Sequence, residues 1–167
     1  MNRRLYLVRH AIAEDRGEAW PDDAARPLTA QGARRFGKAV AGFGRLGESV
    51  DLILTSPLVR ARQTAALLSE GLHGTPPMRV LLELAPGGTP AKTIRALSRV
   101  RDRAEGIALV GHEPDLGEFA QWCLGSRWPL AFKKGGMCRL DLGAWPPDRD
   151  AQLVWFATPK LLRQVGS

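Results

Sequence analysis

The sequence predicts an α/β fold of three layers (α/β/α), in which helices cover both faces of a mostly parallel sheet. Two observations carry this prediction. Four short runs of strand-forming apolar residues alternate with segments whose apolar residues recur at helical spacing, which is typical of parallel strands joined by right-handed crossovers. Near the C-terminus two further strand-like runs are separated only by a turn, so one strand should be antiparallel. The chain has 167 residues and no linker or repeat, so we expect a single domain over residues 1–167.

The strands are expected where apolar runs are short and uninterrupted. They span residues 5–8, 51–54, 80–82 and 107–110 in the alternating part, and residues 137–142 and 152–157 in the hairpin. The run at 5–8 is far too short for a signal peptide or a membrane span. We therefore expect a cytoplasmic protein.

The helices are expected to begin at residues that favour capping. Apolar spacing predicts a helix after each of the first four strands and a short final helix over residues 159–165. In the second helix the apolar stripe leaves Arg60 off the packed face, where it could meet a ligand. The N-cap candidates are Thr29, Ser56 and Thr89, with Pro57 and Pro90 at the next position of the last two helices.

Composition restricts the possible functions only loosely. A formal charge of +7 would permit a nucleic-acid partner, but the basic residues are scattered along the chain, and an anionic phosphoprotein or small phosphate compound is the simpler partner. Cys123 and Cys138 are predicted to be buried thiols, because a chain of this length needs no disulfide framework. The three histidines lack the paired spacing of a metal site, so we expect neither a metal nor another cofactor.

Arginine and histidine follow three of the predicted strands. Arg9 and His10 end the first, Arg60 lies in the helix after the second, and His112 follows the fourth. Open α/β sheets place their chemistry at these carboxyl ends. A neutral imidazole can attack phosphorus while guanidinium groups neutralise the phosphoryl oxygens. We interpret the four residues as a candidate phosphoryl site, with the loop over residues 11–28 expected to cross its mouth.

The order of these motifs resembles the histidine phosphatase superfamily. Its members begin with Arg-His, carry an arginine in a Ser-Pro-x-x-Arg-x-x-x-Thr segment and supply a second histidine late in the chain. Here these motifs are Arg9-His10, residues 56–64 and Gly111-His112. The Arg-Pro-Leu-Thr stretch at 26–29 and the Leu-Glu-Leu-Ala-Pro-Gly-Gly stretch at 82–88 are most similar to SixA-type phosphohistidine phosphatases.

The resemblance implies a compact fold like that of phosphoglycerate mutase, without a lid insertion, and a role for each matched residue. His10 would be the nucleophile that forms a phosphohistidine intermediate, while Arg9, Arg60 and His112 would form the phosphate pocket. In its protonated form, His112 could bond a phosphoryl oxygen. Larger members use an acidic residue to protonate the leaving group, and Glu83 is a possible counterpart here.

The substrate stays open between three alternatives. An open, shallow site would suit phosphohistidine on a signalling protein, which is our leading hypothesis. A sugar or nucleotide phosphate is the alternative substrate for an enzyme. A third possibility is a module that binds phosphate without turnover. The oligomeric state cannot be predicted from these residues.

Overall fold

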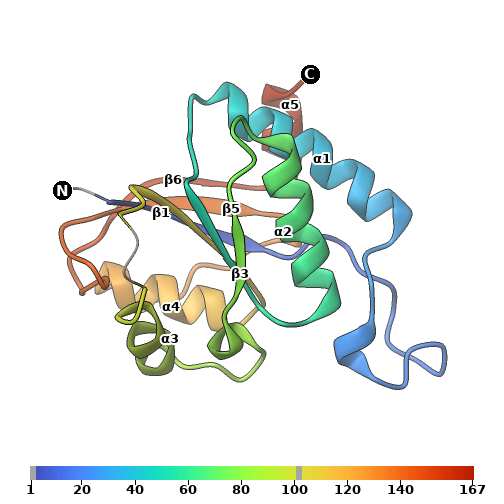
Figure 1. The fold of residues 1–167 in the computed structure, drawn as a ribbon, viewed down its shortest axis with the longest axis horizontal. Coiled ribbons are helices and arrows are strands. Elements are labelled where there is room, and N and C mark those ends of the chain that lie inside the picture. Colours follow the sequence, from blue (N-terminus) through green and yellow to red (C-terminus); the bar gives the residue numbers. More distant parts are fainter. Residues whose placement is uncertain (1–2, 101–102) are drawn as a thin grey trace.

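The computed structural model describes residues 3–100 and 103–167, and within these ranges six strands form one sheet. Their spatial order is β3-β2-β4-β1-β5-β6 (Figure 1). The four strands β1 to β4 pair in parallel, and β5 is antiparallel to both of its neighbours, as the alternating pattern and the hairpin predicted. The strands are β1 (Arg3–Arg9), β2 (Leu52–Thr55), β3 (Met78–Val80), β4 (Gly106–Gly111), β5 (Met137–Leu142) and β6 (Gln152–Ala157).

Helices cover both faces of this sheet, which confirms the three-layer prediction (Figure 1). On one face lie α1 (Ala30–Arg45), α2 (Val59–Gly71) and α5 (Pro159–Val165), and their apolar residues share one core cluster with that side of the sheet. On the other face, α3 (Pro90–Leu97) and α4 (Asp115–Leu124) complete a second cluster. No helix in the described parts of the chain is long and apolar enough to cross a membrane.

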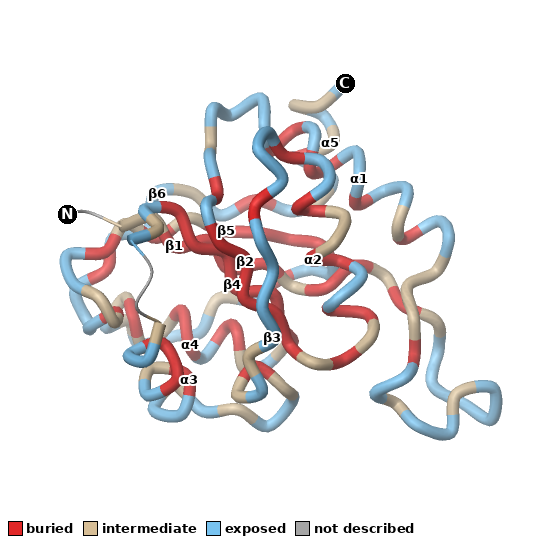
Figure 2. Tube along the Cα trace, viewed as in Figure 1, coloured by how far each residue is buried: buried red, intermediate tan, exposed pale blue. Residues whose placement is uncertain are grey.

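The central strands bring the candidate residues to one edge of the sheet. β1 and β4 are paired along their length up to Arg9 opposite Gly111, and β2 pairs with β4 up to Thr55 opposite Val110. The interior residues of these three strands are buried (Figure 2), because parallel strands in the centre of the sheet are covered on both faces. The residues that follow them, His10, Ser56 and His112, therefore leave the sheet side by side.

Three of the helix N-termini are capped by threonine. The side chains of Thr29, Thr89 and Thr158 accept hydrogen bonds from backbone amides in the first turns of α1, α3 and α5. The prediction for α2 was wrong: this helix begins at Val59, after Leu58, without a side-chain cap. The side chain of Ser56 is instead hydrogen-bonded to His112 in the candidate site, as described below.

The third strand also differs from the sequence prediction. β3 covers Met78–Val80, ends before Leu81, and is exposed at the edge of the sheet. Residues Leu82–Leu84 form a short 3-10 helix, η2, so Glu83 lies on a helical turn rather than at a strand end. Only three residues pair with β2, and the chain then turns away from the sheet.

The segment over residues 11–28 is mostly irregular, as predicted. It contains one 3-10 turn, η1 (Asp23–Ala25), and isolated bridges that join Ala13 to Leu28 and Gly17 to Trp20. Cys123 and Cys138 are buried free thiols, as expected.

Candidate functional site

His10 is buried and held in one tautomer. Its Nδ1 lies 2.7 Å from the carbonyl oxygen of Ala11. A carbonyl can only accept, so Nδ1 carries the proton and Nε2 keeps its lone pair. Burial, together with the charges of Arg60, Arg9 and Lys134, lowers the pKa of His10 to about 4, against the opposing effect of the Ala11 bond. At neutral pH, His10 is therefore an uncharged imidazole with a free Nε2.

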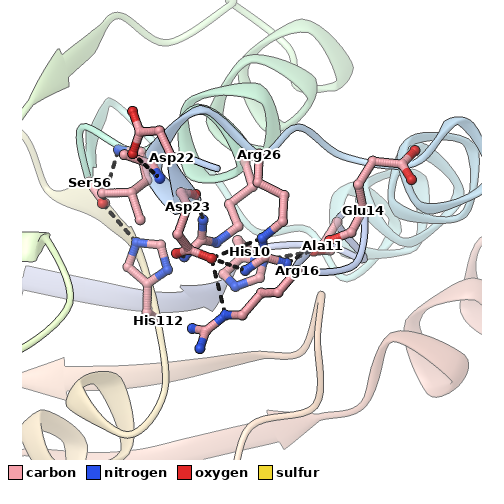
Figure 3. A network of polar contacts seen from close by, with 12 residues as sticks. His10, Ala11, Glu14, Arg16, Asp22, Asp23, Arg26, Ser56 and His112 are labelled. Carbon is pink, nitrogen blue, oxygen red and sulfur yellow. Dashed lines mark hydrogen bonds and ion pairs between the residues drawn. The ribbon is translucent and has the colours of Figure 1, made fainter. Parts of the chain in front are cut away.

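His112 faces His10 across the site. The two ring centroids are 5.1 Å apart, and Nε2 of His112 lies 2.7 Å from Oγ of Ser56 (Figure 3). The hydroxyl of Ser56 has no other acceptor among the described residues, so we assign it as the donor to Nε2. The ring proton is then on Nδ1, a buried atom that has no hydrogen-bond partner within residues 3–100 and 103–167.

The expected charge on His112 needs correction. Burial is the main cause that lowers its pKa, and the nearby His10 and Arg60 contribute to the same shift, which brings the pKa to about 3. Without a bound anion His112 is therefore neutral at physiological pH. It can offer Nδ1–H to a phosphoryl oxygen but supplies no positive charge of its own.

Both arginines have a buried donor that the described residues leave without a partner. Arg9 donates from Nη1 to the carbonyl of Phe132 at 2.6 Å, and Arg60 is 97% buried, not on an open helix face as the apolar stripe suggested. Their Nε atoms are buried and have no partner among the described residues. Buried N–H groups are nearly always paired, so three such donors at one edge of the sheet indicate a site built for an anion.

Asp23 of η1 holds Arg60 in place and was missed by sequence reasoning. The guanidinium of Arg60 donates to the Asp23 carbonyl at 2.7 Å and to its carboxylate at 2.9 Å. Arg16 and Arg26 pair with the same carboxylate (Figure 3). Partial burial acts to raise the pKa of Asp23, but hydrogen bonds from Arg26 and Arg60 keep it below its usual value. Asp23 thus links the middle of the loop over residues 11–28 to the candidate site.

Thr64 and Gly135 fix the backbone around His10. The hydroxyl of Thr64 donates to the carbonyl of Arg60 at 2.7 Å and accepts the amide of Ala11 at 3.0 Å, so α2 and the segment after β1 are tied together. The Gly135 amide lies 3.0 Å from the His10 carbonyl oxygen. Its φ of 80° favours glycine at this position.

Glu83 lies near His112 but has another partner. Both residues line a cavity of about 10 Å³, and the Glu83 carboxylate pairs with Arg99 at 3.6 Å. The side chain of Glu83 is 31% exposed. Its assignment as a proton donor stays a prediction.

The described residues hold no cluster of three or more His, Cys, Asp or Glu side chains that could bind a metal ion. Apart from the Asp23 carboxylate and the free Nε2 of His10, the polar groups described above are cationic or neutral donors. Such a set can bind a phosphoryl group and present a nitrogen nucleophile to it.

Two of the missed contacts could not have been read from local patterns. Ser56 was assigned to a helix cap because Ser-Pro is a common helix start, and only the pairing of β2 with β4 places it beside His112. Asp23 stands in a polar loop, and its link to Arg60 spans 37 residues of sequence. Thr64 belongs to the motif over residues 56–64, but its hydrogen bonds could not be predicted without the three-dimensional structure.

Comparison with known proteins identifies the family of this chain. Residues 5–85 match the family model described as "Histidine phosphatase superfamily (branch 1)". An uncharacterized protein of Picosynechococcus sp. is 37% identical over 163 residues, which cover 95% of this chain and 98% of that protein.

Two solved structures show the breadth of the shared fold. The protein histidine phosphatase SixA in complex with tungstate has a TM-score of 0.82 at 21% identity, covering 95% of this chain and 99% of that one. The alpha-ribazole phosphatase of Shigella flexneri has a TM-score of 0.70 at 19% identity, covering 93% and 96%. With the motifs of Arg9, His10 and Arg60 inside the matched region, the chain belongs to the histidine phosphatase superfamily.

Proposed function

We propose that this chain is a phosphatase that uses His10 as its nucleophile and acts on phosphohistidine carried by a signalling protein. One observation supports the chemistry above all others. The free Nε2 of a neutral His10 shares its site with three buried donors that lack partners among the described residues, the Nε atoms of Arg9 and Arg60 and Nδ1 of His112.

The proposed reaction has two steps at one nitrogen. Nε2 of His10 attacks phosphorus, the bond from phosphorus to the substrate imidazole breaks, and that imidazole leaves with its electron pair and takes up a proton. Water then attacks the phosphorus on His10 and loses a proton as it does so. The bond from phosphorus to Nε2 breaks, which releases inorganic phosphate and restores the neutral imidazole of His10. Arg9, Arg60 and His112 hold the phosphoryl oxygens throughout.

The low pKa of His10 favours its assignment as the nucleophile. A nucleophilic imidazole must be unprotonated, and with a pKa of about 4 His10 is unprotonated throughout the physiological range. An imidazole leaving group also needs less help from an acid than an alkoxide does. This agrees with a Glu83 that is paired to Arg99. We keep Glu83 as a candidate acid for ester substrates only.

The test is single-turnover dephosphorylation of a phosphohistidine-carrying protein beside an aryl phosphate. We expect rapid loss of phosphohistidine, weak ester cleavage, and a fall of roughly a thousand-fold or more for both in His10→Ala, because the nucleophile is gone. A phosphoenzyme that is stable to base and labile to acid should accumulate in the wild type. A His10→Ala protein with full turnover would exclude the proposed nucleophile.

Small phosphate esters are the second candidate substrate class. The similarity in fold to an alpha-ribazole phosphatase favours this alternative. Faster cleavage of the aryl phosphate than of phosphohistidine, still dependent on His10, would support it. Tight binding of phosphate without turnover of either substrate would identify a binding module instead.

A further inference from the structure

The positive charge of this protein is concentrated on one face. We define the basic face as α1, α5 and residues 131–136, which together hold eight of the 24 Lys and Arg residues and none of the 17 Asp and Glu residues. The three segments are in contact: α1 packs on α5, and Gly135 lies against Phe36 of α1 and Pro159 of α5. The rest of the chain is nearly balanced in charge, so this face accounts for the net charge of +7.

A small pocket lies within the basic face. Arg35, Lys134 and Arg163 line a cavity of about 30 Å³ that no acidic residue lines. Arg35 and Lys134 are exposed and Arg163 is half-buried. Within the described parts of the chain, none of the three forms an ion pair. Three unpaired cations around one cavity repel each other and would be stabilised by an anion.

The pocket borders the candidate active site. Ala11 lines it, and the carbonyl of the same residue holds His10 in its tautomer. Gly135, which also lines the pocket, is hydrogen-bonded to the backbone of His10. The charge of Lys134 contributes to the lowered pKa of His10. A ligand could therefore place a phosphoryl group at His10 and a second anionic group in the pocket.

We propose that the basic face binds an acidic segment of the protein that presents the phosphoryl group, with one carboxylate seated between Arg35, Lys134 and Arg163. This rests on the proposed function, since it assigns the partner of the same site. The cavity has room for a carboxylate. Its one aromatic lining residue, Phe36, is 98% buried and offers no stacking surface for a nucleic acid.

Binding to a peptide without phosphate tests the face independently of catalysis. The probe is a fluorescein-labelled hexaglutamate peptide, followed by anisotropy at low ionic strength. We expect Arg35→Glu/Arg163→Glu to raise its Kd by about tenfold or more, because two attractive charges become repulsive. The matched control is Arg103→Glu/Arg149→Glu, two exposed residues before β4 and β6 at the opposite edge of the sheet, which should change Kd by less than about twofold.

Two outcomes of this experiment would overturn the proposal. One is equal loss of binding in both charge-reversed proteins. The other is tighter binding of an oligothymidylate than of hexaglutamate, with the oligothymidylate binding lost in Arg35→Glu/Arg163→Glu. This result would assign the basic face to nucleic acid. Arg35→Gln/Arg163→Gln, with thermal unfolding measured for each protein, separates loss of binding from loss of fold.

Turnover of two phosphohistidine peptides then links the face to the site. In one peptide the phosphohistidine is flanked by Glu, and in the other by Gln. Wild type should prefer the Glu peptide in kcat/KM by about tenfold, with the preference lost at high salt and in Arg35→Glu/Arg163→Glu. Hydrolysis of an aryl phosphate should be unchanged in that variant.

The two proposals fail in different ways. Equal kcat/KM for both peptides in the wild type would overturn the role of the basic face while leaving the phosphohistidine activity intact. If neither peptide loses phosphate while the aryl phosphate is hydrolysed, the proposed substrate is wrong. The proposal that the basic face binds an acidic segment of the substrate protein is then also wrong, even if hexaglutamate binds to that face.

Discussion

At the scale of single residues, the site depends on which polar atoms are already paired. Asp23 pairs with Arg60 through both its carbonyl and its carboxylate, which leaves the Nε–H of Arg60 as the buried donor without a partner among the described residues. The carboxylate of Asp23 is 40% exposed, and it carries Arg16 and Arg26 as well. Asp23 therefore acts as a positioning residue, which fixes the orientation of Arg60 before phosphate arrives.

Asp23→Asn should weaken phosphate binding. The amide keeps the shape of the side chain but removes the charge that orients Arg60, so we expect kcat/KM for an aryl phosphate to fall about tenfold. The Ki of inorganic phosphate should rise in parallel, which a purely structural defect would not cause. Asp22→Asn is the matched control: Asp22 caps η1, a role that Asn also fills, and within the described residues it forms no hydrogen bond or ion pair with Arg60. A lower Ki in Asp23→Asn would mean that Asp23 competes with phosphate instead.

At the scale of elements, α1 packs against α5 through a glycine. A Cβ placed on Gly42 would collide with the backbone carbonyl of Leu162, whereas one placed on Gly37 would meet nothing within 4 Å. Both residues lie inside the same helix, so they differ in packing and not in helical environment. The close approach of α1 and α5 also sets the geometry of the basic face.

Gly42→Ala and Gly37→Ala should change stability in opposite directions. Alanine favours the helix by about 1 kcal/mol over glycine, so Gly37→Ala should raise the free energy of unfolding by up to that amount. In Gly42→Ala the collision should outweigh this gain and lower stability by about 1–3 kcal/mol. Urea denaturation of both variants measures the difference. A stabilised Gly42→Ala would show that α5 can shift without cost.

At the scale of the whole molecule, the fold was predictable because strand and helix patterns repeat in order. The runs of 5–8 and 107–110 are buried on both faces and have no helical period, so β1 and β4 were clear. β3 was misplaced because Leu81 and Leu82 continue an apolar run after pairing ends, and only the sheet register determines that limit. Exposed strand ends of this kind carry little local signal.

The candidate site was predictable only in part, for the same reason. Arg9, His10, Arg60 and His112 stand in motifs beside strand ends, so their proximity followed from the parallel sheet. Their protonation states and hydrogen-bond partners could not be predicted, because these depend on burial, and burial arises from the whole fold. The neutral state of His112 is the main example: sequence reasoning left it free to be protonated, and burial beside His10 and Arg60 prevents this.

The two buried histidines should make the protein sensitive to acid. Their pKa values of about 4 for His10 and about 3 for His112 lie below the value of 6.5 expected in the unfolded chain. Between those limits the unfolded chain binds more protons than the folded one, so the stabilising contribution is complete above pH 6.5 and is lost as pH falls. Each histidine contributes a slope of about 1.4 kcal/mol per pH unit where only the unfolded chain is protonated.

Substitution of these histidines should flatten the pH dependence. We expect the decline in the free energy of unfolding between pH 6.5 and 4 to be less steep in His10→Asn or His112→Asn, by up to about 1.4 kcal/mol per pH unit, measured by urea denaturation across that range. The carboxyl of Glu113, whose pKa burial raises, acts in the opposite direction, so the comparison is made between variants and wild type. His73→Asn is the control, because His73 is exposed on a loop and should leave the slope unchanged. An equally steep decline in all four proteins would mean that His10 and His112 can be protonated in the folded state, and the nucleophile would then need a partner that deprotonates it.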